Sequence, residues 1–145
     1  MSTCELCVTK HPAEFWRSRW FYAIDAGSED FPCFLRLVST RHVSEMSDLS
    51  AQERLYLWRL LEVLEEAMIE IVQPDKVNYA QFGNMCPHLH WHVIARWRDD
   101  SHFPECPWGP KQRPAPSATA ERRARTKRLK EVLPALLDRV EKPTD

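Results

Sequence analysis

Three of the six histidines in this 145-residue chain stand at alternate positions of one short run, as His88, His90 and His92. An extended strand sends alternate side chains to opposite faces, so the run predicts three imidazoles on one face, spaced about 6.6 Å apart. Since a buried imidazole without a partner costs about 1–3 kcal/mol, such a face is poor packing material and indicates phosphate chemistry or a metal site. The residues between the histidines, which would face a core, are Leu89, Trp91, Val93 and Ala95.

The central histidine of the run is the natural nucleophile, because imidazole is a fair nucleophile and a good general base near neutral pH. If His90 attacks a phosphorus atom, its neighbours can hold the oxygens, and His92 is placed to reach a phosphoryl oxygen or the leaving group. The second ring nitrogen of His90 then needs an acceptor, for which we expect a backbone carbonyl of the adjoining loop 83–87. Asn84 in that loop offers an amide donor for a phosphate oxygen.

Metal binding is the competing chemistry for the same residues. Two strand histidines at positions i and i+2, with a third ligand, can hold a catalytic zinc ion. However, His88 and His92 would lie about 13 Å apart on a straight strand, too far for both to reach one ion at ~2.1 Å. The spacing therefore favours a nucleophile with helpers, and a metal-dependent hydrolase is the alternative.

Two hairpins are predicted around the histidine run. An aromatic-rich stretch over 20–24 and an apolar stretch over 34–38 indicate two strands joined by a polar turn. The stretch 76–82 also alternates like a strand, and a break of five residues separates it from the histidine run. This spacing indicates a second antiparallel hairpin.

A long helix is predicted between the two hairpins, over about residues 50–73. Ser50 and Glu53 have the spacing of a capping box, apolar residues then recur at helical spacing, and Pro74 ends the pattern. With this helix across one face of an antiparallel sheet of about five strands, the chain is predicted to be an α+β domain.

The C-terminal part is predicted to be a loop followed by helix. Residues 99–117 are rich in proline and contain Trp108, whereas residues 118–141 have a helical pattern interrupted by Pro134. That proline indicates either a kinked helix or two short helices. Six basic residues gather within 122–130. A solvated helix face is favoured over a nucleic-acid patch, because no aromatic residues are interleaved and the net charge is only -1.

Length and composition fit one domain over 1–145, with its core over about 4–98. A hydrophobic content of 43% supports a sizeable core. Nothing at the N-terminus resembles a signal peptide and no apolar stretch approaches a membrane span, so we expect a cytoplasmic protein without a membrane partner. The five cysteines are then interpreted as thiols or metal ligands rather than as a disulfide framework.

The histidine run and its surroundings resemble the histidine-triad (HIT) superfamily. The motif His88-Leu-His90-Trp-His92-Val-Ile is similar to the family signature, and the likeness extends over about residues 4–98, including the run from Phe34 to His42. Among members, the stretch after the triad is similar to small bacterial proteins described as diadenosine tetraphosphate hydrolase-like. The resemblance implies a HIT-like fold, a homodimer, and hydrolysis or transfer of a nucleotide at its α-phosphate, with dinucleoside polyphosphates as the substrate type. It also implies that the middle histidine, His90, becomes transiently nucleotidylated.

The resemblance also implies substrate-binding roles and shows two departures. Asp25 falls where the family places an acidic residue on the ribose hydroxyls, and Asn84 and His92 are expected to contact the phosphate. The family's usual glutamine and small hydroxyl residue before the triad are Asn84 and Met85 here. Loss of that hydroxyl motivates an alternative function, a nucleotide-binding regulatory module with little turnover.

A pair of cysteines near the N-terminus, Cys4 and Cys7, has zinc-ligand spacing. Two more ligands would be needed, and on spacing alone Cys86 and Cys106 are candidates, or the pair is simply two thiols. The family resemblance implies instead that a structural zinc is completed by His42 and His88. We therefore expect a structural zinc on Cys4, Cys7, His42 and His88, and no organic cofactor.

Overall fold

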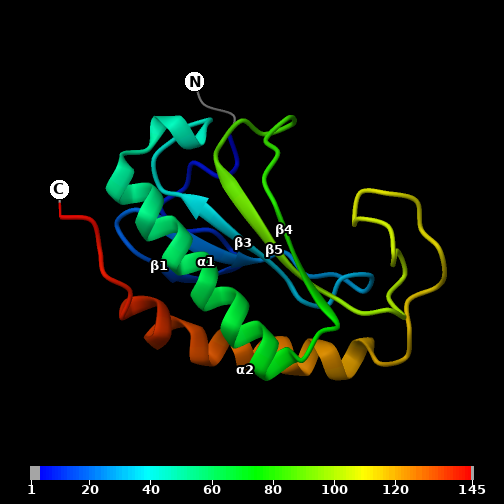
Figure 1. Ribbon diagram of the computed structural model, residues 1–145. Coiled ribbons are helices and arrows are strands. Elements are labelled where there is room, and N and C mark those ends of the chain that lie inside the picture. The colour runs from blue at the N-terminus through cyan, green and yellow to red at the C-terminus, as the bar shows by residue number, and fades with distance from the viewer. Residues whose placement is uncertain (1–3, 145) are drawn as a thin grey trace.

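An open five-stranded antiparallel sheet carries two helices on one of its faces (Figure 1). The computed structural model describes residues 4–144. Neighbouring strands follow the order β1-β2-β3-β5-β4, so the central position belongs to β3. This architecture confirms the predicted α+β fold. The strands are β1 (Glu14–Arg17), β2 (Phe21–Asp25), β3 (Phe34–Ser39), β4 (Lys76–Ala80) and β5 (His90–Arg96).

The first helix, α1 (Ala51–Val72), follows a short 3-10 helix, η1 (Met46–Asp48). Its predicted capping box is confirmed: the Glu53 amide donates to Ser50 Oγ at 3.1 Å, and the Ser50 amide donates to Glu53 Oε1 at 2.9 Å. The helix ends at Gln73, which adopts the left-handed conformation at φ 57° directly before Pro74. The helix therefore begins and ends where local sequence signals place it.

The second helix, α2 (Thr119–Asp138), is one element with Pro134 inside it. Its apolar stripe joins the same core as α1, so both helices cover the same face of the sheet (Figure 1). The basic cluster lies partly or fully exposed on α2, and four of its six residues also make ion pairs. These pairs are Arg122–Asp99, Arg123–Asp25, Arg125–Glu121 and Lys130–Asp25.

The two faces of the sheet have different compositions because successive strand residues alternate between them. In β3, Leu35 and Leu37 belong to the main core beneath the helices, whereas Val38 packs on the other side. The histidines of β5 and Arg36 of β3 lie on this second, helix-free face. Neither helix of the described residues is long and apolar enough to cross a membrane.

Candidate functional site

A cavity of about 470 Å³ opens on the helix-free face of the sheet, beside two of the predicted catalytic histidines. His90 and His92 come from β5, and Arg36 comes from β3, where it pairs with His92 in the strand register. The loop after β4 and one residue of the proline-rich loop complete the lining. Those lining residues are Phe82, Gly83, Asn84, Met85, Cys86 and Trp108, with Glu5 at the N-terminal side.

His90 is held in one tautomer by the backbone. Its Nδ1 lies 2.6 Å from the carbonyl oxygen of His88, and because a carbonyl only accepts, Nδ1 carries the proton. Nε2 therefore keeps its lone pair. The prediction that a carbonyl of the loop 83–87 accepts this bond is wrong, because the acceptor is the next residue, His88. The carbonyl of Cys86, inside that loop, instead accepts from the His88 amide. Burial lowers the pKa of His90 and the Arg36 charge lowers it further, which keeps the ring neutral and nucleophilic.

His92 lies beside His90, with 5.0 Å between the ring centroids. Only 4% of the residue is exposed, and burial lowers its pKa to about 3, assisted by repulsion from His90 and Arg36. Its Nδ1 is buried without a hydrogen-bond partner among the described residues, so Nε2 is the ring nitrogen that can reach a ligand. His92 is accordingly a neutral imidazole at physiological pH.

Aromatic rings line the side of the cavity next to His92. The ring centroid of Trp108 lies 5.0 Å from that of His92, and Phe82 lies 4.9 Å from Trp108; the buried ring of Phe34 lies behind them, 5.3 Å from His92 and outside the cavity lining. Phe82 and Trp108 are 56% and 51% exposed, which is unusual for rings of this size. Their roles were not predicted; the one available signal was a tryptophan inside a proline-rich loop. Two exposed rings beside a polar centre form a surface suited to a planar ligand.

The loop after β4 places the predicted Asn84 at the cavity. Gly83 has a positive φ of 86°, a conformation that favours glycine, and it directs the chain back towards β5. Asn84 lines the cavity as expected for a phosphate donor. Met85 is 99% exposed, and its side chain provides no hydroxyl at the position where the family usually has one.

Asp25 lies elsewhere. Asp25 of β2 pairs with Leu35 of β3 in the strand register, and Leu35 belongs to the core under the helices. Asp25 is therefore on the helix-covered face of the sheet, where its carboxylate faces α2. Arg123 Nη2 and Lys130 Nζ lie 3.0 and 2.8 Å from Asp25 Oδ2, and these cations lower its pKa against the opposing effect of burial. Asp25 is not among the residues that line the histidine cavity. The expected ribose contact has no support in this geometry, and the ion pairs instead attach α2 to the sheet.

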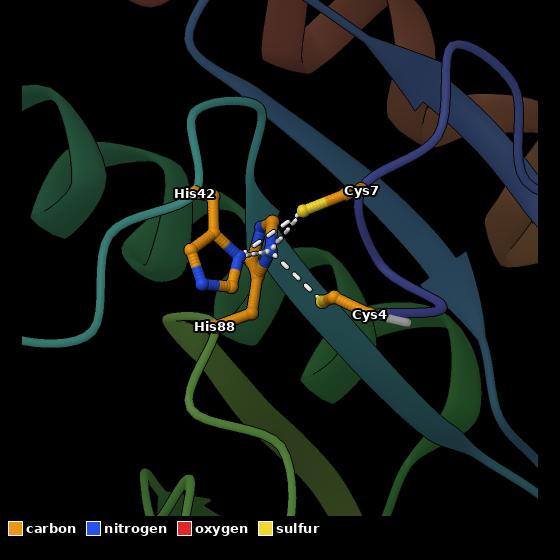
Figure 2. A group of neighbouring side chains, drawn as sticks. All are labelled: Cys4, Cys7, His42 and His88. Atoms are coloured by element: carbon orange, nitrogen blue, oxygen red, sulfur yellow. Dashed lines mark hydrogen bonds between the residues drawn. The ribbon is translucent and has the colours of Figure 1, made fainter. Parts of the chain in front are cut away.

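His88 also departs from the predicted arrangement. Strand β5 begins at His90, so the predicted strand is too long by two residues at this end. His88 is fully buried, and its ring does not line the cavity but joins the two N-terminal cysteines and His42 (Figure 2). Its Nε2 donates to the Ser39 carbonyl at 2.6 Å, which leaves Nδ1 unprotonated. The three histidines are therefore divided between two sites that share one backbone segment.

The four side chains of this second cluster place their ligand atoms within 4.8 Å of one another, close enough to hold one metal ion. Figure 2 shows Cys4 and Cys7 from the N-terminal segment meeting His42, which follows β3, and His88. The Nδ1 atoms of His42 and His88 are 3.1 Å apart, and Cys7 Sγ lies 3.1 and 3.3 Å from them. Ligands around a tetrahedral zinc would stand about 3.3 Å apart for N–N and about 3.5 Å for S–N. The donor set and its spacing therefore fit zinc.

The alternative ligands named from spacing alone are not part of this group of four. Cys86 Sγ lies 3.7 Å from Cys4 Sγ but lines the cavity, and Cys106 is exposed. The expected set of Cys4, Cys7, His42 and His88 is the one whose ligand atoms all lie within 4.8 Å of one another.

Comparison with known proteins agrees with this geometry. The family model of the HIT domain matches residues 16–99, more than half of the chain. This protein belongs to the HIT family. HIT domains bind nucleotides and include hydrolases and transferases, which accounts for a histidine-lined cavity with aromatic walls. No curated protein matches this HIT chain by sequence.

Solved HIT structures share the fold. A histidine triad protein from Bradyrhizobium japonicum is 28% identical with a TM-score of 0.65, and the match covers 79% of this chain and 87% of that one. One from Marinobacter aquaeolei is 27% identical with a TM-score of 0.66, over 83% and 89% of the chains. A Zn-bound histidine triad family protein from Mycobacterium smegmatis is 19% identical with a TM-score of 0.63, over 96% and 98%. At that identity the last likeness concerns the fold alone.

Proposed function

We propose that this HIT protein is a nucleotide hydrolase or transferase that cleaves its substrate at the α-phosphate through a nucleotidyl-His90 intermediate. The observation that carries the proposal is the hydrogen bond from His90 Nδ1 to the His88 carbonyl at 2.6 Å. It fixes the ring so that the Nε2 lone pair is free, and burial keeps the ring neutral. Both properties are required of a nucleophilic histidine.

The proposed reaction has two displacements. In the first, the His90 Nε2 lone pair forms a bond to the α-phosphorus, and the bond from phosphorus to the leaving oxygen or nitrogen breaks with its electron pair. The ring gains positive charge, which the His88 carbonyl stabilises through the Nδ1 proton. In the second, a water oxygen attacks the phosphorus, the P–N bond breaks with its electron pair returning to Nε2, and the attacking water releases a proton to the solvent. A nucleoside monophosphate is released and neutral His90 is restored.

The state of His92 favours phosphoanhydrides over phosphoramidates as substrates. An amine leaving group must gain a proton, whereas a polyphosphate leaves as an anion and needs only hydrogen bonds. His92 is neutral, because its pKa is lowered to about 3, so it can donate a hydrogen bond but is a poor source of a proton at pH 7. A dinucleoside polyphosphate-like substrate is therefore the best match, with its base against Phe82 and Trp108 and its phosphate within reach of Asn84.

Isotope labelling tests this route directly. A dinucleoside tetraphosphate is hydrolysed in water enriched in ¹⁸O, and the products are separated and weighed by mass spectrometry. Attack at the α-phosphorus puts one ¹⁸O atom in the nucleoside monophosphate and none in the nucleoside triphosphate. Label in the triphosphate alone would exclude the proposed site of attack, and turnover by His90→Ala at the wild-type rate would exclude the proposed nucleophile.

Zinc is proposed as a structural ion on Cys4, Cys7, His42 and His88. When bound it would supply a closed tetrahedral link between the N-terminal segment and the residues just before β5, with no open position for substrate. Elemental analysis should find about one zinc per chain. Cys7→Ser should lose the metal and melt at a lower temperature, whereas Cys106→Ser, a change at an exposed thiol outside the cluster, should keep both. Retention of zinc by Cys7→Ser would exclude this ligand set.

A regulatory module with little turnover is the second candidate, and Met85 motivates it, because a 99% exposed methionine provides no hydroxyl to the phosphate. Nucleotide binding without product after many hours would favour it. A metal-dependent hydrolase is a third possibility. Hydrolysis that stops on chelation without loss of the fold would favour that class, whereas unchanged hydrolysis favours a histidine nucleophile.

A homodimer is proposed through the edge of the sheet formed by β4. This strand pairs with β5 on one side only, and next to it Trp58 of α1, 41% exposed, packs against Tyr79 and Trp91. An open strand edge beside an exposed tryptophan is a surface that protein association covers. Sedimentation equilibrium should give twice the chain mass, and Trp58→Lys should give the monomer mass.

A further inference from the structure

Arg36 is a cationic residue of the cavity for which no role was predicted from the sequence. It is the central residue of the apolar segment Phe34–Val38 in β3. Its strand position pairs with Ile24 on one side and His92 on the other, which places it on the helix-free face. There it lines the same cavity as His90 and His92. A long charged side chain at the centre of a five-stranded sheet is costly unless something compensates it.

Among the described residues, the charge of Arg36 is compensated only in part. Its Nε is buried without a hydrogen-bond partner, and none of the ion pairs among residues 4–144 includes it. Burial lowers the pKa of Arg36, which records that the surroundings disfavour the charge. Glu5 is the one carboxylate among the cavity residues. Its negative charge favours the Arg36 cation, but Glu5 is exposed and forms no ion pair with Arg36.

Arg96 shows how the same face of the sheet treats an arginine with a structural role. Its Nε and Nη2 donate to the two oxygens of Asp100 at 2.8 and 3.0 Å, and its Nη1 donates to Asn78 at 2.9 Å. Both members of that ion pair are 3% exposed, so the charge is fully compensated. Arg36 differs in that its Nε has no hydrogen-bond partner and the residue lines a cavity.

We propose that Arg36 is the phosphate-binding cation of this cavity and holds the non-bridging oxygens of the phosphate that His90 attacks. The proposal rests on the proposed nucleotide chemistry, and it names the residue that neutralises the substrate's charge. A guanidinium presents parallel N–H donors that match two oxygens of one phosphate. Arg36 is the one arginine or lysine among the cavity residues.

This role also explains how the centre functions without the hydroxyl that the family usually places at position 85. Met85 donates nothing to a phosphate, whereas Arg36 approaches from the neighbouring strand with a charge-assisted donor. Charge that develops on the phosphate oxygens during the displacement would be stabilised by the same guanidinium, in a partly buried place where such an interaction is strong.

Ligand binding to the full-length protein tests the proposal without relying on turnover. Arg36→Met removes the charge with little change of shape, and Arg36→Lys keeps the charge but loses the two parallel N–H donors of the guanidinium. As a control, Arg19→Met removes an exposed cation outside the cavity. Adenosine monophosphate, adenosine and inorganic phosphate are titrated by calorimetry. We expect Arg36→Met to weaken adenosine monophosphate by at least about tenfold and adenosine by less than about twofold, with Arg36→Lys intermediate and Arg19→Met unchanged.

A stability measurement on the free protein separates binding from a structural role. Because a charge that is compensated only in part is removed, free Arg36→Met should melt at the same temperature as wild type or higher, and phosphate should raise the melting temperature of wild type only. Equal loss of affinity for adenosine and its monophosphate would overturn the proposal. So would a lower melting temperature of free Arg36→Met with unchanged affinity for the monophosphate.

The outcome for Arg36 is distinguishable from the outcome for the nucleotidyl mechanism. If wild type forms a His90 adduct and Arg36→Met binds the monophosphate normally, the Arg36 proposal fails alone. If Arg36→Met loses the monophosphate while wild type never forms an adduct, the mechanism fails and Arg36 remains a phosphate-binding residue. Wild type that binds adenosine as well as its monophosphate contradicts the Arg36 proposal.

Discussion

Acid should destabilise this protein through His92 in particular. The ring is 4% exposed, lies among Phe34, Phe82 and Trp108, and has a pKa of about 3 instead of 6.5. A base whose pKa falls on folding takes up its proton more readily in the unfolded chain. The free energy of unfolding therefore falls as the pH drops below 6.5, and this loss continues until the pH reaches about 3.

The magnitude follows from the two pKa values. At pH 5 an unfolded histidine with a pKa of 6.5 is almost fully protonated, whereas His92 in the folded protein is not. Each pH unit in this window changes the free energy of unfolding by about 1.4 kcal/mol, so His92 alone should remove about 2 kcal/mol between pH 7.5 and pH 5. A loss of this size is a large part of the stability of an ordinary domain.

Urea unfolding at pH 7.5 and pH 5 measures the effect, with His92→Gln as the matched variant that cannot titrate. Groups distant from His92 contribute equally to both proteins, so the difference between the two pH dependences reports His92 together with its coupling to His90. We expect the wild type to lose about 2 kcal/mol more than His92→Gln over this range. Parallel pH dependences would refute the reasoning, because they would mean that His92 is protonated as easily in the folded protein as in the unfolded chain.

Three further changes test other parts of the structure. Asp100→Asn leaves Arg96 buried without its carboxylate and should lower the free energy of unfolding by about 3–5 kcal/mol in urea. Asp99→Asn removes an ion pair in which the aspartate is 54% exposed and should lower it by less than about 1 kcal/mol, and equal losses would contradict the burial argument. Trp108→Ala should weaken adenosine monophosphate by about 1–3 kcal/mol in calorimetry but leave ribose 5-phosphate unchanged, and equal loss for both ligands would exclude base stacking. Asp25→Asn should lower the melting temperature while the folded protein keeps its nucleotide affinity, and a selective loss of ribose over deoxyribose ligands would restore the ribose role.

Local signals in the sequence were sufficient for the elements that carry the site. Ser50 and Glu53 begin α1 and Pro74 follows its end. These effects act over only a few residues, so the bounds of the helix can be predicted from the local sequence. The β2–β3 and β4–β5 hairpins and the placement of His90 and His92 on one face follow from alternation in the same way. Strand β1 was not predicted, since it has only four residues and a register shift between Glu14 and Trp16 breaks its alternation.

The features that depend on neighbours distant in the sequence were not predictable from pattern alone. The departure of His88 from the strand depends on the Ser39 carbonyl, which binds its ring from β3. The absence of an ion-pair partner for Arg36 among the described residues becomes evident only when β3 and β5 lie side by side and Glu5 is seen to make no ion pair with it. The contact of Trp108 with His92 depends on how the proline-rich loop folds back over the sheet. Resemblance to a family supplied the metal-ligand set, because Cys4 and His88 are 84 positions apart.

Direct detection of the covalent intermediate tests the central claim. Wild-type protein is mixed with a dinucleoside tetraphosphate, quenched within milliseconds in denaturant at neutral pH, and digested for mass spectrometry. We expect one nucleoside monophosphoryl group on His90, formed before the steady state and absent from His90→Ala, while His92→Gln still forms it more slowly. Full turnover with no adduct at any time, or an adduct on a residue other than His90, would contradict the account.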